Sequence, residues 1–179
     1  CEKLEAIYAD VLAFIESSAK LLQTRRRLSS IKRVSMAELF FEFLNFELTP
    51  NTTRDQLLAL GAQRGWSYRS SPSDSWDEIF FALFIEFIEP EFKKWDIVAI
   101  HPFPARLCAL SRITSDGWAD RMEIYFHGIE IANGFHELND PIENLARLKA
   151  EQARALELGK SVPPIDSEFL TYLQKGMPP

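Results

Sequence analysis

The stretch that decides the fold reads Met122-Glu-Ile-Tyr-Phe-His-Gly-Ile-Glu-Ile-Ala-Asn-Gly-Phe-His-Glu-Leu-Asn-Asp-Pro141. Its alternating apolar residues predict a β-hairpin, with strands at about residues 121 to 126 and 129 to 138. His127-Gly128 has the character of a two-residue turn between them. Acidic and polar side chains interrupt the pattern, and a charge that faces inward is costly unless it meets a partner. The hairpin is therefore the first place to look for a ligand site.

The pairing across this hairpin brings carboxylates together. With His127 and Gly128 as the turn, residue 125 pairs with residue 130. Glu123, Tyr125 and Glu130 then share one face, where the two carboxylates are diagonal neighbours. Carboxylates this close either both lie in water or share a cation, and Mg²⁺ is suited because it takes one or two protein carboxylates together with phosphate oxygens. Spacing alone favours the solvated arrangement.

Two further polar residues belong to the same stretch. Strict alternation puts Asn133 and Glu137 on the face opposite Glu130. All of these side chains can meet one ligand only if the second strand bulges or kinks. We predict this irregularity at Gly134, since glycine inside a strand often marks a bulge.

The hairpin is flanked by segments with helical periodicity or capping patterns. We predict helices at about residues 2 to 23, at Met36–Phe46, from Thr53 to Gly65, from Ser75 until Pro90, at about residues 141 to 158 and after Asp166, with a short strand at Ile97–Ile100. Helices come first, then a small antiparallel sheet, then helices again. This order predicts an α+β fold, an antiparallel sheet with flanking helices, and not βαβ alternation.

Composition limits the class of protein. The chain has 179 residues, of which 46% are hydrophobic, enough for one domain with a sizeable core. It has neither a long uncharged apolar run nor a signal-peptide pattern, so we expect a soluble cytoplasmic protein with no membrane partner. Cys1 and Cys108 provide neither a disulfide framework nor paired metal-ligand spacing. The net charge of -6 argues against a broad nucleic-acid-binding face.

One local group of cations, Arg25-Arg-Arg27 with Lys32 and Arg33, follows the first predicted helix. An RNA-binding patch is one interpretation of it. We favour the other, in which these cations complement the dipole at a helix C-terminus beside a solvated loop.

Four segments carry a resemblance to a known family. They are Trp76-Asp-Glu-Ile-Phe80 through Ile88-Glu-Pro90, Ile100-His-Pro-Phe-Pro-Ala105 with Leu110, Gly128-Ile-Glu-Ile-Ala-Asn-Gly-Phe-His-Glu-Leu138, and Ile165-Asp166 to Gly176-Met-Pro178. With them the chain resembles part of the catalytic domain of class II lysyl-tRNA synthetases, most of all the truncated paralogue that attaches lysine or β-lysine to elongation factor P. Full synthetases usually have Tyr-Thr-Glu where this chain has Phe135-His-Glu137, which favours the ligase paralogue.

The resemblance implies an ATP-dependent activation of lysine or a lysine analogue, followed by transfer to elongation factor P. By position, Glu123 and Glu130 would be contacts for ATP and Mg²⁺. Asn133 and Glu137 would hold the amino-acid substrate, and Ala105 with the loop from His101 would line the same cleft. The family's adenylation needs no general base, so we expect no catalytic role for the histidines.

The chain also departs from the family. Arg106-Leu107 replaces the usual Ser-Gln pair after the loop alanine, and Asp120 replaces a glutamate before the hairpin. The resemblance further implies that residues 1–179 are a single partial catalytic domain between class II motifs 2 and 3, and that the full-length protein is a homodimer. Two other functions stay open: a lysyl-tRNA synthetase acting on tRNA-Lys, and a catalytically silent binding module.

Overall fold

The computed structural model describes residues 2–23 and 28–176 of the chain. Within these residues, four strands form the main sheet: β1 (Ile31–Val34), β2 (Ile97–Ile100), β5 (Arg121–Phe126) and β6 (Ile129–Phe135), in the order β1-β2-β5-β6. The predicted strand at Ile97–Ile100 and the hairpin are confirmed, with a turn at His127 and Gly128, both at positive φ. Antiparallel pairs join β2 to β5 and β5 to β6.

β1 was not predicted and changes the character of the sheet. It pairs with β2 in parallel, so the sheet is mixed. Lys32 and Arg33 lie inside this strand, which means that our assignment of them to a solvated loop was wrong. A second small sheet pairs β3 (Phe103–Pro104) with β4 (Trp118–Ala119), and a turn of 3₁₀-helix, η3 (Ala105–Leu107), follows β3 directly.

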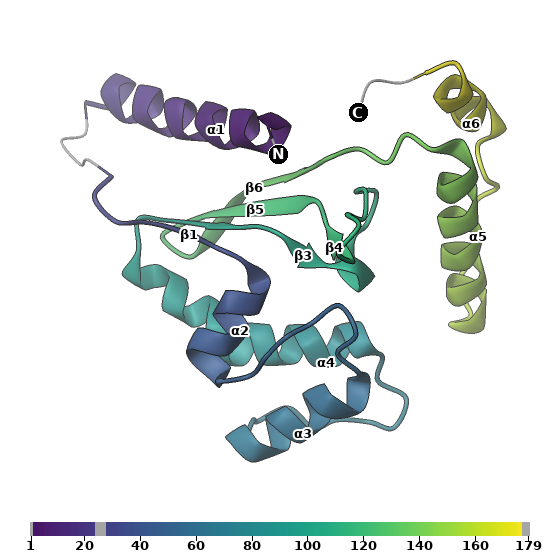
Figure 1. The fold of residues 1–179 in the computed structure, drawn as a ribbon, viewed down its shortest axis with the longest axis horizontal. Helices are drawn as coiled ribbons and strands as arrows, with labels where there is room; N and C mark the ends of the chain where they lie inside the picture. The colour runs from purple at the N-terminus through teal and green to yellow at the C-terminus, as the bar shows by residue number, and fades with distance from the viewer. Residues whose placement is uncertain (1, 24–27, 177–179) are drawn as a thin grey trace.

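Helices cover both faces of the main sheet (Figure 1). α1 (Glu2–Leu21) lies on one face, where Leu4 and Tyr8 pack against Ile97, Ala99, Met122 and Ile124. On the other face lie α2 (Met36–Leu44), α3 (Arg54–Arg64) and α4 (Trp76–Leu83). The larger core lies between the sheet and these three helices, and each fully buried aromatic or aliphatic side chain in it contributes about 1.5–3 kcal/mol to folding.

Capping boxes begin all three helices on this second face. The predicted pairs Thr53/Gln56 and Ser75/Glu78 are confirmed, and Ser35/Glu38 is a further one. α4 ends at Leu83, and the chain continues as a π-helix, η1 (Phe84–Ile88), and a 3₁₀-helix, η2 (Glu89–Lys94). Pro90 therefore lies in the first turn of η2, where a missing N–H costs nothing, and does not itself end α4.

The last two helices stand apart from the sheet (Figure 1). α5 (Pro141–Glu157) and α6 (Ser167–Gln174) pack on each other and begin at the predicted caps, Asp140 and Asp166. Among the helices of residues 2–23 and 28–176, none is long and apolar enough to cross a membrane. Cys1, Arg25 to Arg27, Met177 and Pro178 fall outside the described residues.

Candidate active site

A β-bulge in the hairpin gathers the predicted site residues. Glu123 pairs with Asn133 and Tyr125 pairs with Glu130, so Ile131 is the extra residue on β6. The extra residue reverses the alternation, and Glu130 and Asn133 come to the same face as Glu123. The bulge lies at Ile131, so its predicted position at Gly134 was wrong.

Gly134 has a different role, on the opposite face. A Cβ atom built there would lie 3.3 Å from Cγ2 of Ile7 on α1. The glycine therefore lets α1 approach β6 closely.

The side-chain amide of Asn133 connects the two predicted metal ligands, and the guanidinium of Arg121 contacts one of them and the amide. The Nδ2 group of Asn133 donates to Glu130 Oε1 at 3.2 Å and lies 3.4 Å from Glu123 Oε1. Arg121 Nη2 donates to Glu123 Oε1 at 2.5 Å, and its Nε donates to Asn133 Oδ1 at 3.2 Å. Sequence analysis did not identify Arg121, although its place two residues before Glu123 on the same strand face could have suggested it.

Glu123 is the buried member of this group, whereas Glu130 is exposed. Burial raises the pKa of Glu123, and the neighbouring carboxylates of Glu130 and Glu89 act in the same direction. The hydroxyl of Tyr125, which donates to Glu123 Oε2 at 2.7 Å, and the Arg121 guanidinium oppose this rise in pKa. A further cation beside Glu123 would favour its ionised form.

The loop that contains Ala105 reaches this site through Arg121. Nη1 of Arg121 donates to the backbone carbonyl of Leu107 at 2.9 Å, and the guanidinium lies 4.9 Å from the centre of the Phe103 ring. Ala105 is the first residue of η3, between these two contacts. In place of the family's Ser-Gln pair, Leu107 is buried in the core and Arg106 stacks on Trp76.

Glu137 lies beyond the end of β6. Its backbone forms a bridge to Ser111, and its carbonyl accepts a hydrogen bond from Arg112 Nε at 3.0 Å. The described hydrogen bonds of Glu123, Glu130 and Asn133 do not include the Glu137 carboxylate. The structure therefore brings together three of the predicted residues and places Ala105 and Glu137 on the segments that flank them.

Glu123 and Glu130 are donors of the chemical type that Mg²⁺ takes, namely carboxylates. Among the described residues, no group of three or more His, Cys, Asp or Glu side chains is arranged to hold a metal ion. Two carboxylates with open positions are nevertheless the usual protein share of a magnesium site, because phosphate oxygens and water complete the octahedron.

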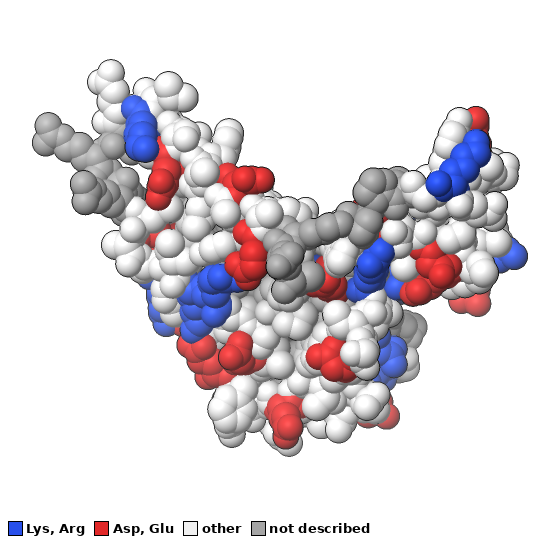
Figure 2. Space-filling model, turned by 45° about the horizontal axis from the view of Figure 1, so that its top comes forward, with Lys and Arg blue, Asp and Glu red and all other residues white. Residues whose placement is uncertain are grey.

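The described cations of the predicted basic group are paired. Lys32 Nζ contacts Glu42 at 2.5 Å and lies 4.5 Å from the Trp95 ring, and Arg33 pairs with Glu5. On the face shown in Figure 2, basic side chains are scattered among acidic ones. Neither arrangement favours an RNA-binding patch.

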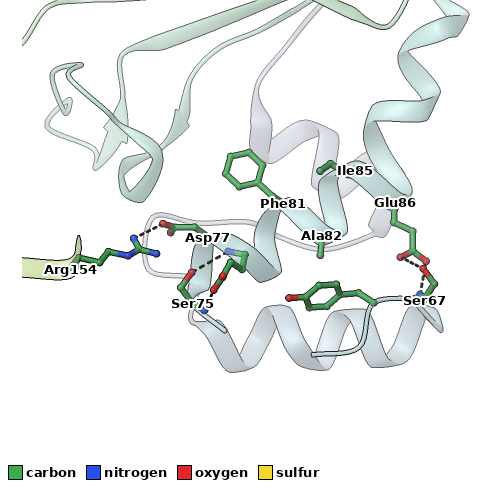
Figure 3. Close-up of a pocket in the computed structure, with 10 residues that line it drawn as sticks. Ser67, Ser75, Asp77, Phe81, Ala82, Ile85, Glu86 and Arg154 are labelled. Atoms are coloured by element: carbon green, nitrogen blue, oxygen red, sulfur yellow. Dashed lines mark hydrogen bonds and ion pairs between the residues drawn. The ribbon is translucent and has the colours of Figure 1, made fainter. Parts of the chain in front are cut away.

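A groove of about 690 Å³ lies on α4, away from the hairpin residues. Figure 3 shows Asp77 reaching toward Arg154 at one end and Glu86 reaching toward Ser67 at the other. None of the predicted site residues lines it.

The sequence of the chain matches a known family. The family model for class II tRNA synthetases (D, K and N) matches residues 5–179, and the chain belongs to this family. Among curated proteins, the elongation factor P–(R)-beta-lysine ligase of Vibrio cholerae is 36% identical over 168 residues, which is 93% of this chain and 52% of that protein. The ligase of the same name from Vibrio parahaemolyticus is 33% identical over 88% of this chain and 49% of its own length. The chain thus spans about half the length of these relatives.

Proposed function

We propose that residues 1–179 form part of a single catalytic domain that uses ATP and Mg²⁺ to activate lysine or β-lysine and transfers the product to elongation factor P. The observation that carries this proposal is the convergence of Glu123, Glu130 and Asn133 on one face of the hairpin. The names of the relatives support the acceptor and the amino acid. A cytoplasmic location and a homodimeric full-length protein belong to the same proposal.

The two carboxylates have distinct tasks in this proposal. Glu123 and Glu130 would hold Mg²⁺, which would supply the positive charge that neutralises the phosphates of ATP during adenylate formation. Arg121 lowers the pKa of the buried Glu123, against the rise that burial causes, and orients the carboxylate, because its guanidinium contacts it at 2.5 Å. Tyr125 donates to the other carboxylate oxygen and restricts its rotation.

Asn133, Glu137 and Ala105 form the amino-acid side of the site. The side-chain amide of Asn133 can both donate and accept, which suits the polar groups of an amino acid. The Glu137 carboxylate is suited to pair with a substrate ammonium group. Ala105 contributes a small side chain that leaves room in the loop.

The test is ATP–pyrophosphate exchange in the complete protein, with lysine and β-lysine as substrates. We expect Glu130→Gln to abolish exchange, because the amide is a poor ligand for Mg²⁺. The exposed residue Glu157, at the end of α5, provides a matched control, and Glu157→Gln should exchange normally. Normal exchange in Glu130→Gln would remove this residue from the metal site.

The acceptor is tested separately with radiolabelled amino acid. Labelling of elongation factor P supports the proposal, whereas labelling of tRNA-Lys would indicate a lysyl-tRNA synthetase. A wild-type protein that performs neither transfer nor exchange would be a silent binding module.

A further inference from the structure

We propose that Asp120 is a positioning residue, whose carboxylate, held between His101 and His136, sets the spacing of the two segments that bind the amino-acid substrate. This inference rests on the proposed function, because it assigns the substrate to Ala105, Asn133 and Glu137. We call Asp120, His101 and His136 the clamp.

The clamp connects three separate parts of the chain. Nε2 of His101, which directly follows β2, lies 2.8 Å from Asp120 Oδ1. Nδ1 of His136, which directly follows β6, lies 3.0 Å from Asp120 Oδ2. Asp120 itself precedes β5 and is 5% exposed. One buried carboxylate thus uses both oxygens to join the ends of β2 and β6 to the start of β5.

The chemistry of the contacts determines where the protons lie. An ionised carboxylate can only accept hydrogen bonds, so the ring nitrogen that faces Asp120 carries the proton in each histidine. His101 is then protonated at Nε2 and His136 at Nδ1. For the neutral imidazole the contact with Asp120 thus selects opposite tautomers in the two residues, Nε2–H in His101 and Nδ1–H in His136.

The clamp lies on the opposite face of the sheet from the carboxylate site. His136 donates its backbone N–H to the Asp120 carbonyl at 2.9 Å, which makes these two residues cross-strand neighbours. In the ladder, Arg121 pairs with Phe135, and Glu123 pairs with Asn133. Because alternate residues face opposite ways, Asp120 and His136 point away from the face of Arg121 and Glu123. The clamp therefore acts on the site only through the backbone.

Two members of the clamp adjoin residues of the site, and the third opens the loop that leads to a site residue. His136 immediately precedes Glu137, and Asp120 immediately precedes Arg121. His101 opens the loop that leads to Ala105. Loss of the clamp should therefore loosen the amino-acid side of the site, whereas Glu123 and Glu130 keep their own contacts on the other face.

The first experiment compares Asp120→Asn with wild type in pyrophosphate exchange, using the complete protein. We expect the KM for the amino acid to rise at least about tenfold, with the KM for ATP unchanged within about twofold, because a displacement of about 1 Å in positioning groups has effects of this order or larger. Asp10→Asn makes the same chemical change on the exposed face of α1 and should leave both values unchanged. Equal changes in the two KM values, or no change, would overturn the positioning role.

A pair of variants at His136 separates positioning from general stability. The side-chain amide of asparagine can occupy the place of the Nδ1–H group, so His136→Asn should keep the KM for the amino acid within about threefold of wild type. His136→Leu has no donor and should reproduce the effect of Asp120→Asn. If both variants behave alike, the hydrogen bond to Asp120 does not position the substrate.

Nuclear magnetic resonance tests the clamp without any activity. Long-range proton–nitrogen correlations of the imidazoles should show His101 protonated at Nε2 and His136 at Nδ1, and Asp120→Asn should shift the ring nitrogens of both. Unchanged ring resonances would refute the clamp even in an active ligase. Confirmed tautomers in a protein that exchanges with neither lysine nor β-lysine would instead refute the proposed function.

Discussion

Arg121 offers the sharpest test of the site, because one side chain contacts Glu123, Asn133 and the carbonyl of the Ala105 loop. Its guanidinium contacts Glu123 at 2.5 Å and the Leu107 carbonyl at 2.9 Å, and the two side chains of the ion pair are only 15% and 8% exposed. Removing one partner of a buried ion pair costs about 3–5 kcal/mol, since the other charge is left without compensation. We take the lower end, because Arg121 keeps some contact with water, and expect Arg121→Met to cost about 3 kcal/mol.

The assay is thermal and urea-induced unfolding. For a chain of this size, about 3 kcal/mol corresponds to a decrease in Tm of about 6–12 °C. Without the guanidinium the pKa of Glu123 rises still further, so the folded variant takes up a proton more readily than the unfolded chain. A carboxyl group whose pKa is raised by folding makes the folded state less stable as the pH increases, because its ionised form is disfavoured there. The loss in free energy of unfolding caused by Arg121→Met should therefore be larger at about pH 8 than at about pH 5.

A double-mutant cycle identifies the partner. Glu123→Gln removes the buried charge, so Arg121→Met should cost about 2 kcal/mol less in that background than in wild type. Lys94→Met, which breaks an exposed ion pair with Glu91, should cost less than about 1 kcal/mol. Additive effects of the two substitutions, or an Arg121→Met cost no larger than that of Lys94→Met, would refute the reasoning.

Two further predictions concern the scaffold. A Cβ atom at Gly61 in α3 would lie 2.4 Å from Cδ2 of Trp66, so Gly61→Ala should destabilise by about 1–3 kcal/mol in urea denaturation despite its better helix propensity, and a Trp66→Leu background should relieve the loss. Hydrogen bonds from the backbone N–H groups of Ser29 and Ser30 hold the pKa of Asp96 well below its ordinary value of 3.8. A carboxylate whose pKa is lowered by folding stabilises the protein at pH values above its ordinary pKa, and this contribution is lost as the pH falls. The Tm of wild type should therefore drop in acid, whereas Asp96→Asn should have a lower Tm at neutral pH and a weaker dependence of Tm on acid. Parallel curves of Tm against pH for the two proteins would contradict this.

Much of the secondary structure could be predicted from the sequence, because the residues that begin and end its elements lie close together in the chain. The capping boxes at Thr53 and Ser75 involve residues three positions apart, and both were found where predicted. The turn at His127-Gly128 could likewise be predicted from the sequence, because few residue pairs adopt positive φ at adjacent positions. β1 was not predicted because Lys32 and Arg33 occupy half of it, and their charges are paired with Glu42 and Glu5, which lie on other elements.

The sequence by itself determined the α+β class and the hairpin, because periodicity and capping are properties of neighbouring residues, and its resemblance to class II lysyl-tRNA synthetases named the candidate residues. The tertiary structure alone decided which side chains meet. The bulge at Ile131 reverses the facing of every residue on one side of it, and a period-two pattern cannot locate a single inserted residue. The contacts of Arg121 with Leu107, and of Asp120 with His101 and His136, likewise join segments 14 to 19 residues apart. They form only when packing on both faces of the sheet brings those segments together.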